Sequence, residues 1–242
     1  MRYAFMSDVH SNIEAFEAVL EDIDNYNPDK ILFLGDIVGY GPNPNECVAR
    51  LLEVSNFTLG GNHDWAVVGK TSSEYFNPFA REALNWTIET LTEKHADFLK
   101  TTEASAIVDG FQVAHSTPKH PEEWRYIMSQ KEALGNYLYL EADICFIGHS
   151  HQPVIIEYES AEDLGIYRDS FMELDTEKKY LINVGSVGQS RDGNEDSCWV
   201  MYDSVACNVE FHRVRYDVRA TQKKMAMAKL PQYLIDRLSF GR

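Results

Sequence analysis

Short apolar runs that stop at polar residues dominate the start of the chain. Residues 3–6 and 31–34 are apolar along their whole length, which is typical of parallel strands buried on both faces. Between these runs, apolar residues recur every three or four positions behind Ser11 and Asn12, two residues that favour a helix N-terminus. The pattern therefore predicts a strand, a helix over 12–26 and a second strand.

The same reading predicts the elements further along the chain. Asp109-Gly110 between two apolar runs predicts a β-hairpin over 105–114. Helices are expected at 44–53, within 74–103 and near 130–140, and strands at 56–59, 144–147, 154–158, 180–184, 198–202 and 209–214. The acidic stretch 159–177 has few apolar residues and is expected to be a solvated loop or insert.

Parallel strand-helix units followed by antiparallel strands predict an α/β fold built on two sheets. The chain contains no repeat, low-complexity tract or linker composition that would divide it. We therefore expect one domain over residues 1–242, with a core over about 1–215 and a C-terminal helix and tail over 216–242.

The charge balance restricts the ligands that this chain can bind unaided. The 242 residues include 38 acidic and 22 basic side chains, a formal net charge of −16, with an ordinary 44% of hydrophobic residues. Nucleic acids and anionic lipid surfaces are bound through clustered Lys and Arg, so neither is an expected partner. If a phosphate is the ligand, a bound cation must supply the positive charge.

Cysteine spacing and hydropathy indicate the compartment. The four cysteines form no CxxC pair or zinc-ribbon pattern, which favours reduced side chains in a cytoplasmic protein. No apolar stretch approaches 18 residues, and the first residues lack the apolar region of a signal peptide. A cytoplasmic location away from membranes is therefore expected.

Histidines gather at the predicted strand ends. Five of the eight lie in short polar turns there, joined by two aspartates and an asparagine: His10, His63, His115, His149 and His151, with Asp8, Asp36 and Asn62. Neutral imidazole and carboxylate suit Mn, Fe, Co, Ni and Zn. Residues two apart in an extended segment point to one side, so Asp8 and His10 can share one ion, whereas His149 and His151 can share an ion or reach two.

The order of these motifs resembles the calcineurin-like metallophosphoesterase superfamily, and in particular its small bacterial and archaeal phosphodiesterase-type members. The motifs are Asp8-Val9-His10, Gly35-Asp36, Gly61-Asn62-His63-Asp64, His115 and Gly148-His149-Ser150-His151, and residues 183–189 look like a turn found in the small members. The resemblance implies a four-layer α/β/β/α sandwich with mixed sheets flanked by helices. It also implies two ion sites that share Asp36: Asp8, His10, Asp36 and His151 for one, and Asp36, Asn62, His115 and His149 for the other.

The implied function is hydrolysis of small phosphomonoesters, phosphodiesters or nucleotides. Two divalent ions about 3.5–4 Å apart can clamp a phosphate and hold a bridging hydroxide for in-line attack. Manganese is the expected metal, with iron, nickel, cobalt and zinc as alternatives. Asn62 and His63 would contact the substrate, and His63, which is not a ligand in that family, would protonate the leaving oxygen. The oligomeric state stays open.

Departures from the family pattern leave several alternatives. Gly39 and Tyr40 stand where Ser/Thr protein phosphatases and dinucleoside-tetraphosphate hydrolases carry an acid and an arginine, so those activities are alternatives without direct support. Arg191 is a candidate phosphate-binding residue, with a surface turn as the other interpretation. Asp64 is interpreted as a turn or cap residue, and orientation of His63 is its alternative role.

The loop behind His115 is the other uncertain segment. His120, Trp124, Arg125 and Tyr126 either pack there or stack on a planar leaving group. A non-catalytic scaffold that binds protein partners is the alternative from another functional class. Such scaffolds typically lack some ligands, whereas every ligand position is filled in this chain.

Overall fold

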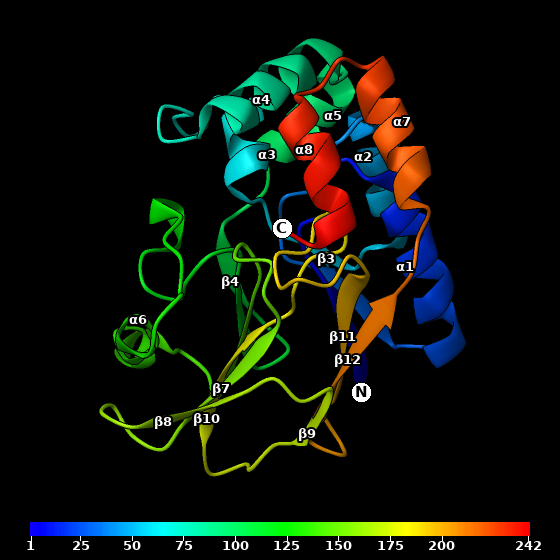
Figure 1. Cartoon of the computed structure of the whole chain (residues 1–242). Helices are drawn as coiled ribbons and strands as arrows, with labels where there is room; N and C mark the ends of the chain where they lie inside the picture. The colour runs from blue at the N-terminus through cyan, green and yellow to red at the C-terminus, as the bar shows by residue number, and fades with distance from the viewer.

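The computed structural model describes all 242 residues and contains two six-stranded sheets that pack against each other (Figure 1). The first sheet has the order β3 (Phe57–Thr58), β2 (Lys30–Phe33), β1 (Arg2–Met6), β11 (Ser197–Asp203), β12 (Asn208–Val214) and β9 (Phe171–Glu173). The second has the order β4 (Ser105–Val108), β5 (Phe111–Ala114), β6 (Ile144–Ile147), β10 (Lys179–Asn183), β7 (Val154–Tyr158) and β8 (Leu164–Tyr167). Both sheets are mixed, because β1, β2 and β3 are parallel in one, and β5, β6 and β10 in the other.

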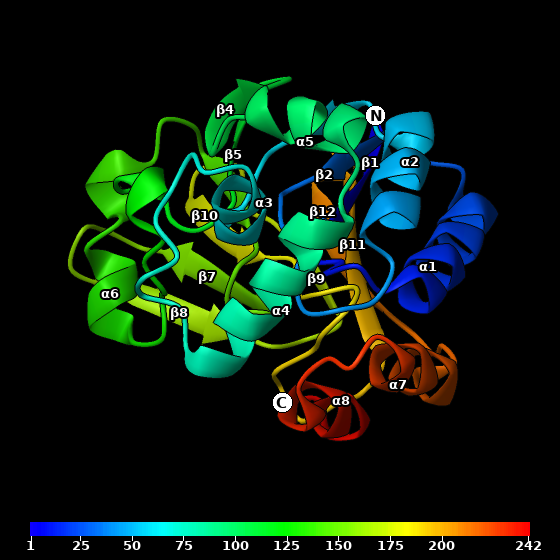
Figure 2. The ribbon, with the colours of Figure 1, turned by 90° about the horizontal axis from the view of Figure 1, so that it is seen from above.

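Helices cover the outer faces of the two sheets. They are α1 (Ile13–Tyr26), α2 (Pro44–Val54), α3 (Asn62–Val67), α4 (Pro78–Thr90), α5 (Glu93–Lys100), α6 (Gln130–Leu134), α7 (Val218–Met227) and α8 (Gln232–Arg237), with 3-10 turns η1 (Pro121–Glu123), η2 (Tyr137–Tyr139) and η3 (Leu238–Phe240). Seen from above, α1 and α2 lie on one side and α6 on the other, with the sheets between them (Figure 2). None of these helices has both the length and the apolar composition that crossing a membrane requires.

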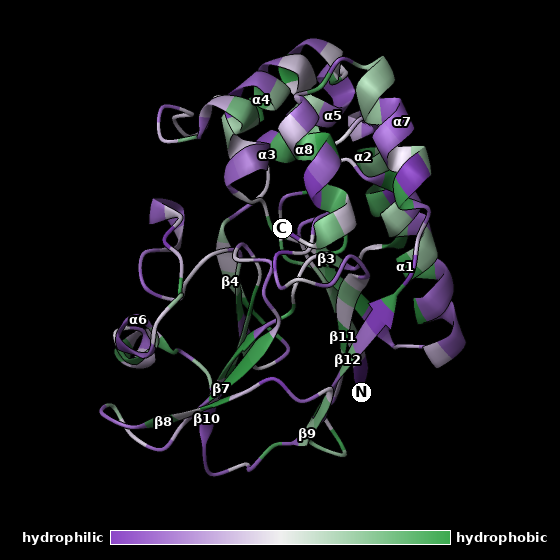
Figure 3. Ribbon diagram, viewed as in Figure 1, coloured by the Kyte–Doolittle hydropathy of each residue, from purple (hydrophilic) through white to green (hydrophobic).

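Three apolar layers hold this arrangement together. Between the sheets, the rings of Phe5 and Phe146 stack with centroids 3.9 Å apart, and Phe111 packs edge-on against both. One outer layer joins the first sheet to α1 and α2, and the other joins the second sheet to α6. The surface helices accordingly mix hydrophilic and hydrophobic residues along their length (Figure 3). The expected four-layer α/β/β/α fold is confirmed.

The acidic stretch 159–177 differs from its prediction as a loop. It contains β8, which pairs with the edge of β7, and β9, which pairs with β12. Leu164 is buried in the apolar layer beside α6, and Met172 packs against the layer between the sheets. An edge strand needs only main-chain pairing and one or two buried side chains, so its acidic composition did not reveal it.

The C-terminal residues form α7, α8 and η3 rather than one helix with a tail. Helix α7 begins behind Asp217, whose side chain accepts from the Ala220 amide, and it lies against α1. Met225, Leu234 and Leu238 form an apolar cluster with Tyr40 and Ala83. This cluster anchors the end of the chain beside Tyr40, which lies in the loop that follows β2.

Candidate metal centre

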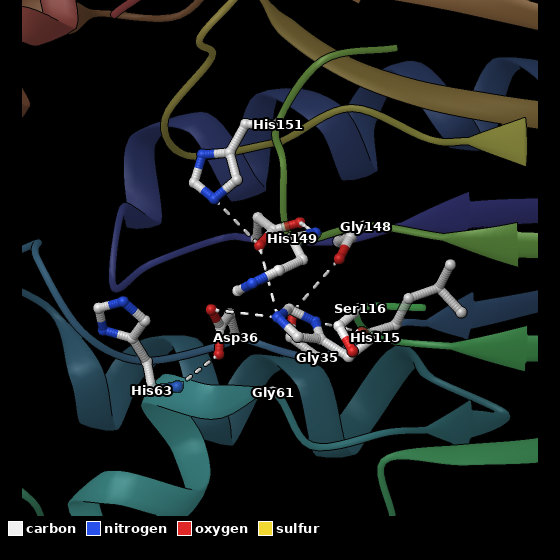
Figure 4. Close-up of polar contacts among 12 residues, drawn as sticks. Gly35, Asp36, Gly61, His63, His115, Ser116, Gly148, His149 and His151 are labelled. Carbon is white, nitrogen blue, oxygen red and sulfur yellow. Dashed lines mark hydrogen bonds and ion pairs between the residues drawn. The ribbon is translucent and has the colours of Figure 1, made fainter. Parts of the chain in front are cut away.

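The predicted site residues meet where β1, β2, β5 and β6 end. Asp8 and His10 follow β1, Asp36 follows β2, His115 follows β5, and His149 and His151 follow β6, while Asn62 and His63 open α3. All eight side chains are buried. In Figure 4, Asp36 lies between His63 and His115, with His149 and His151 above it. The ends of strands from both sheets therefore bring together every residue that the sequence singled out as a metal ligand.

Three overlapping groups of candidate ligand atoms are each close enough together to hold an ion. Asp8, His10 and His151 form the first, Asp36, His115 and His149 the second, and His10, Asp36 and His63 the third, which shares a residue with each of the other two. In the first group, the Nε2 atoms of His10 and His151 are 3.1 Å apart, and His151 Nε2 is 3.1 Å from Asp8 Oδ1. Asp36 Oδ2 is 3.3 Å from His115 Nε2 and 3.7 Å from His10 Nε2. Asp36 therefore lies within 4 Å of a member of the first group and a member of the second.

Unpartnered polar atoms give an independent test of whether these residues fit a metal. Asp8 Oδ1, Asn62 Oδ1 and His115 Nε2 are fully buried and make no hydrogen bond in the protein. Buried polar atoms nearly always have a partner, because desolvating them without one costs about 1–3 kcal/mol. All three atoms can ligate a divalent ion, so the donor set fits the expected metals.

Main-chain carbonyls fix the direction of four imidazoles. A ring N–H of each donates to a carbonyl oxygen: His10 Nδ1 to Val38 at 3.1 Å, His115 Nδ1 to Leu34 at 2.7 Å, His151 Nδ1 to Gln189 at 2.5 Å, and His149 Nε2 to Trp124 at 2.9 Å. These bonds fix which ring nitrogen donates to the backbone, so the other nitrogen of each ring faces the centre and is the one that can act as a ligand atom. No residue type in the sequence signals these carbonyl partners, which is why sequence reasoning did not find them.

The backbone of the same loops is unusual. Five of the predicted ligands have a positive φ between 49° and 66°: Asp8, His10, Asp36, His149 and His151. A non-glycine residue in this region costs of order 1–3 kcal/mol, and such residues concentrate at functional sites. These loop conformations therefore lower the stability of the fold, and they direct the five side chains toward the other predicted ligands.

Asp64 links the loop that follows β2 to the loop that leads into α3. Its Oδ2 accepts from the amides of Asp36 at 2.7 Å, Gly61 at 3.0 Å and Ile37 at 3.3 Å, and its Oδ1 accepts from Val38 at 3.1 Å. The side chain is fully buried. Asp64 is thus a cap that ties the loop after β2 to the start of α3, in agreement with the interpretation as a turn or cap residue.

His63 contacts Asp36 and makes no hydrogen bond with the Asp64 side chain. Its amide donates to Asp36 Oδ1 at 2.8 Å, and its Nδ1 is buried without a partner. A Cβ placed on Gly39 would lie 2.4 Å from that Nδ1. Gly39 also has a φ of +93°, a conformation that favours glycine. Both the close approach of His63 and the backbone conformation therefore require glycine at this position.

Charges within the centre shift several pKa values. Burial raises the pKa of Asp8 and Asp36, but the neighbouring histidines outweigh it and hold both carboxyls below their ordinary range. Burial lowers the pKa of His115, yet the two aspartates raise it to about 9. Burial lowers the pKa of His63 to about 4 and that of His149 to about 3. The aspartates are therefore ionised at pH 7, as metal binding requires.

Of the four residues considered in the loop behind His115, two contact the predicted ligand His149. The ring of Tyr126 stacks on His149 with centroids 4.2 Å apart and an interplanar angle of 12°. Trp124 packs edge-on against Trp65 and supplies the carbonyl that holds His149. His120 instead packs near Tyr139, and Arg125 pairs with Glu123 on the surface.

Arg191 lies next to the predicted ligand His151, whose carbonyl oxygen accepts from the Arg191 amide at 3.2 Å. Its Nη2 is 3.4 Å from the Tyr40 hydroxyl and 3.3 Å from Gln189 Oε1. Burial lowers the pKa of His63 and of His151, and the charge of Arg191 lowers both further. The side chain is partly buried rather than on the outer surface. The structure thus places Arg191 beside the predicted ligands.

Known proteins resemble this chain along most of its length. Residues 1–204 match the calcineurin-like phosphoesterase superfamily domain. An uncharacterized protein of Methanocaldococcus jannaschii is 40% identical over 244 residues, which covers 99% of this chain and 98% of that protein.

Solved structures extend the likeness to the fold. A metallophosphoesterase from Sphaerobacter thermophilus is 38% identical, with a TM-score of 0.89 over 100% of this chain and 99% of its own. A hypothetical protein from Pyrococcus horikoshii has a TM-score of 0.79 at 17% identity, over 100% of this chain and 98% of its own, and so shares the fold. The chain belongs to the calcineurin-like phosphoesterase superfamily.

Proposed function

We propose that this protein is a dinuclear metal-dependent phosphoesterase that hydrolyses small phosphomonoesters, phosphodiesters or nucleotides. The observation that carries the proposal is the pair of ligand groups joined by Asp36, whose Oδ2 faces His115 on one side and His10 on the other. Asp8, His10, Asp36 and His151 would hold one ion, and Asp36, Asn62, His115 and His149 the second. When bound, two such ions supply charge for the phosphoryl oxygens and a nucleophile at neutral pH. Manganese is the proposed metal.

His63 is the proposed general acid. Because the pKa of His63 is lowered to about 4, its imidazole is neutral at pH 7 in the free protein. A phosphoryl group beside it would raise that pKa through its negative charge, which prepares the ring to pass a proton to the leaving oxygen. The buried Nδ1 has no competing protein partner. Asn62, with its unpartnered Oδ1, precedes His63 at the start of α3 and is proposed to contact metal and substrate.

Positive charge beside the predicted metal ligands would attract phosphate in spite of the acidic surface. The net charge of −16 repels phosphates from most of the surface. Arg191, which contacts Tyr40 and lies next to His151, is proposed to bind the substrate beside the metal ligands. Phosphate binding is therefore confined to this site, and long nucleic acids are poor substrates.

Hydrolysis of activated esters tests the proposal. We expect bis(p-nitrophenyl) phosphate or p-nitrophenyl phosphate to be cleaved after addition of Mn²⁺, and cleavage to disappear with a chelator. Asp36→Asn should abolish turnover, whereas Asp97→Asn, at a surface carboxylate paired with Lys100, should behave as the wild type. Absence of cleavage of both esters with Mn²⁺, Fe²⁺, Co²⁺, Ni²⁺ and Zn²⁺ would refute the proposed function.

A further inference from the structure

His149 is held differently from the other three imidazoles that main-chain carbonyls orient. Its Nε2 donates to the carbonyl of Trp124 at 2.9 Å, and Trp124 is only partly buried in the loop that joins β5 to α6. The carbonyls that orient the other three rings belong to buried residues, namely Leu34, Val38 and Gln189. A surface loop therefore orients one predicted ligand of the second ion, whereas buried segments orient the other three imidazoles.

The same loop makes a second contact with His149 through the side chain of Tyr126. The two rings are stacked, with centroids 4.2 Å apart and an interplanar angle of 12°. His149 is 4% exposed and Tyr126 is 46% exposed, so the tyrosine is the outer ring of the stack. Stacking opposes a tilt of the imidazole, because a tilt would separate the two ring faces. The Trp124 carbonyl and the Tyr126 ring together fix the direction and the plane of the His149 imidazole.

Side chains, and not main-chain hydrogen bonds, hold this part of the loop in place. Residues 124–128 form neither helix nor strand, and the amides of residues 125–127 donate to no group of the protein. Trp124 packs edge-on against Trp65, with centroids 5.2 Å apart, and its Nε1 donates to Thr71 Oγ1 at 3.2 Å. Its φ of +53° is rare for a bulky residue, and such conformations concentrate at functional sites. The packing of Trp124 thus fixes where its carbonyl points.

We propose that Tyr126 is a positioning residue for the second metal ion and acts through His149. Stacking keeps Nδ1 of His149 directed toward Asp36 and His115, with which it forms one candidate ligand group. This inference rests on the dinuclear centre of the proposed function and adds that the two ions are not equivalent. Buried segments orient the histidines of the first ion, so only the affinity for the second ion depends on Tyr126.

Calorimetric titration of the metal-free protein with Mn²⁺ tests this role without requiring turnover. We expect two binding events in the wild type. Tyr126→Ala should weaken one event at least about tenfold, as loss of a group that orients a metal ligand typically does, and leave the other within about twofold. Tyr126→Phe keeps the stacked ring and should bind both ions as the wild type does. Tyr139→Ala is the matched control, because Tyr139 is 37% exposed and packs near His120, a histidine outside the centre.

The possible outcomes separate this inference from the proposed function. The event weakened in Tyr126→Ala should be the one that disappears in His149→Gln. Unchanged affinities in Tyr126→Ala, equal weakening of both events, or the same loss in Tyr126→Phe would overturn the positioning role and leave the dinuclear centre intact. If Tyr126→Ala does not fold, Tyr126→Leu decides by the same criteria, because leucine fills the space without a ring to stack. A wild type that binds a single ion would refute the dinuclear centre of the proposed function, and this inference with it.

Discussion

Replacing Asp64 by asparagine should destabilise the protein and loosen its metal centre. The carboxylate of Asp64 accepts four main-chain N–H groups, from Asp36, Ile37, Val38 and Gly61, over 2.7–3.3 Å. Asparagine has the same shape but only one accepting oxygen, so its NH2 group would face at least one amide donor. One loop carries Asp36 itself, and the other leads into Asn62 and His63 at the start of α3.

The size of the effect can be worked out from these contacts. Burial and the charge of Asp36 raise the pKa of Asp64 to about 7, so we consider pH 8.5, at which its carboxyl is ionised. At that pH, loss of one charge-assisted hydrogen bond costs about 1.5–3 kcal/mol, and the buried amide left without an acceptor costs about 1–3 kcal/mol more. We therefore expect Asp64→Asn to lower the free energy of unfolding by about 3–5 kcal/mol. For a chain of this length, that corresponds to a fall in Tm of roughly 6–20 °C.

Urea unfolding in the presence of a chelator measures this loss without a contribution from bound metal. Asp97→Asn is the matched control, because the Asp97 side chain is 62% exposed and its ion pair with Lys100 lies on the surface. A calorimetric titration with Mn²⁺ should in addition show weaker metal binding in Asp64→Asn only. If Asp64→Asn were as stable as Asp97→Asn and bound Mn²⁺ equally well, the role of Asp64 as the tie between the two loops would be wrong.

The geometry of the site supports three further predictions. His63→Asn should slow hydrolysis of phenyl phosphate by about a hundredfold or more and of p-nitrophenyl phosphate much less, since only the poor leaving group needs a proton; equal losses in the two steady-state assays would argue against a general acid. Gly39→Ala should reduce turnover of both esters at least about tenfold because its Cβ would meet His63. Gly110→Ala is the control: Gly110 has the same φ of +93° but open space around it, so this variant should lose stability and keep its activity. Equal activities in the two variants would show that contact with His63 does not matter. In metal-free protein, the pKa of His115 is raised from 6.5 to about 9, so its contribution to stability is complete below pH 6.5 and is lost as the pH rises toward 9. Urea unfolding at pH 6.5 and 8.5 should show this decline in the wild type, and a decline of equal size in His115→Gln would contradict the assignment.

The sequence was sufficient for elements whose side chains repeat a simple pattern. Strand β6 and the hairpin of β4 and β5 were predicted at their observed bounds, because continuous apolar runs are interrupted there by strong turn residues. The ligand residues were found because each strand that carries them ends in polar residues. Their grouping within each sheet was predictable, since parallel strands of one sheet end at the same edge. The sequence predicted one edge of one sheet, whereas the ligands come from strand ends of two sheets that pack together.

The sequence was insufficient where long-range contacts decide the structure. Strand β9 depends on pairing with β12, which lies more than thirty residues away in the chain. Arg237 was interpreted as part of a C-terminal helix and tail, because nothing near it in the sequence indicates that α8 packs beside Tyr40. The main-chain carbonyls that orient the imidazoles carry no side-chain signal at all.

The central claim is that the two ligand groups joined by Asp36 each hold one metal ion. Anomalous diffraction at the manganese edge, from crystals of the protein loaded with Mn²⁺, tests it most directly. We predict two peaks about 3.5–4 Å apart, with Asp36 contacting both. A single peak with four protein ligands, or manganese only outside this site, would contradict the dinuclear centre.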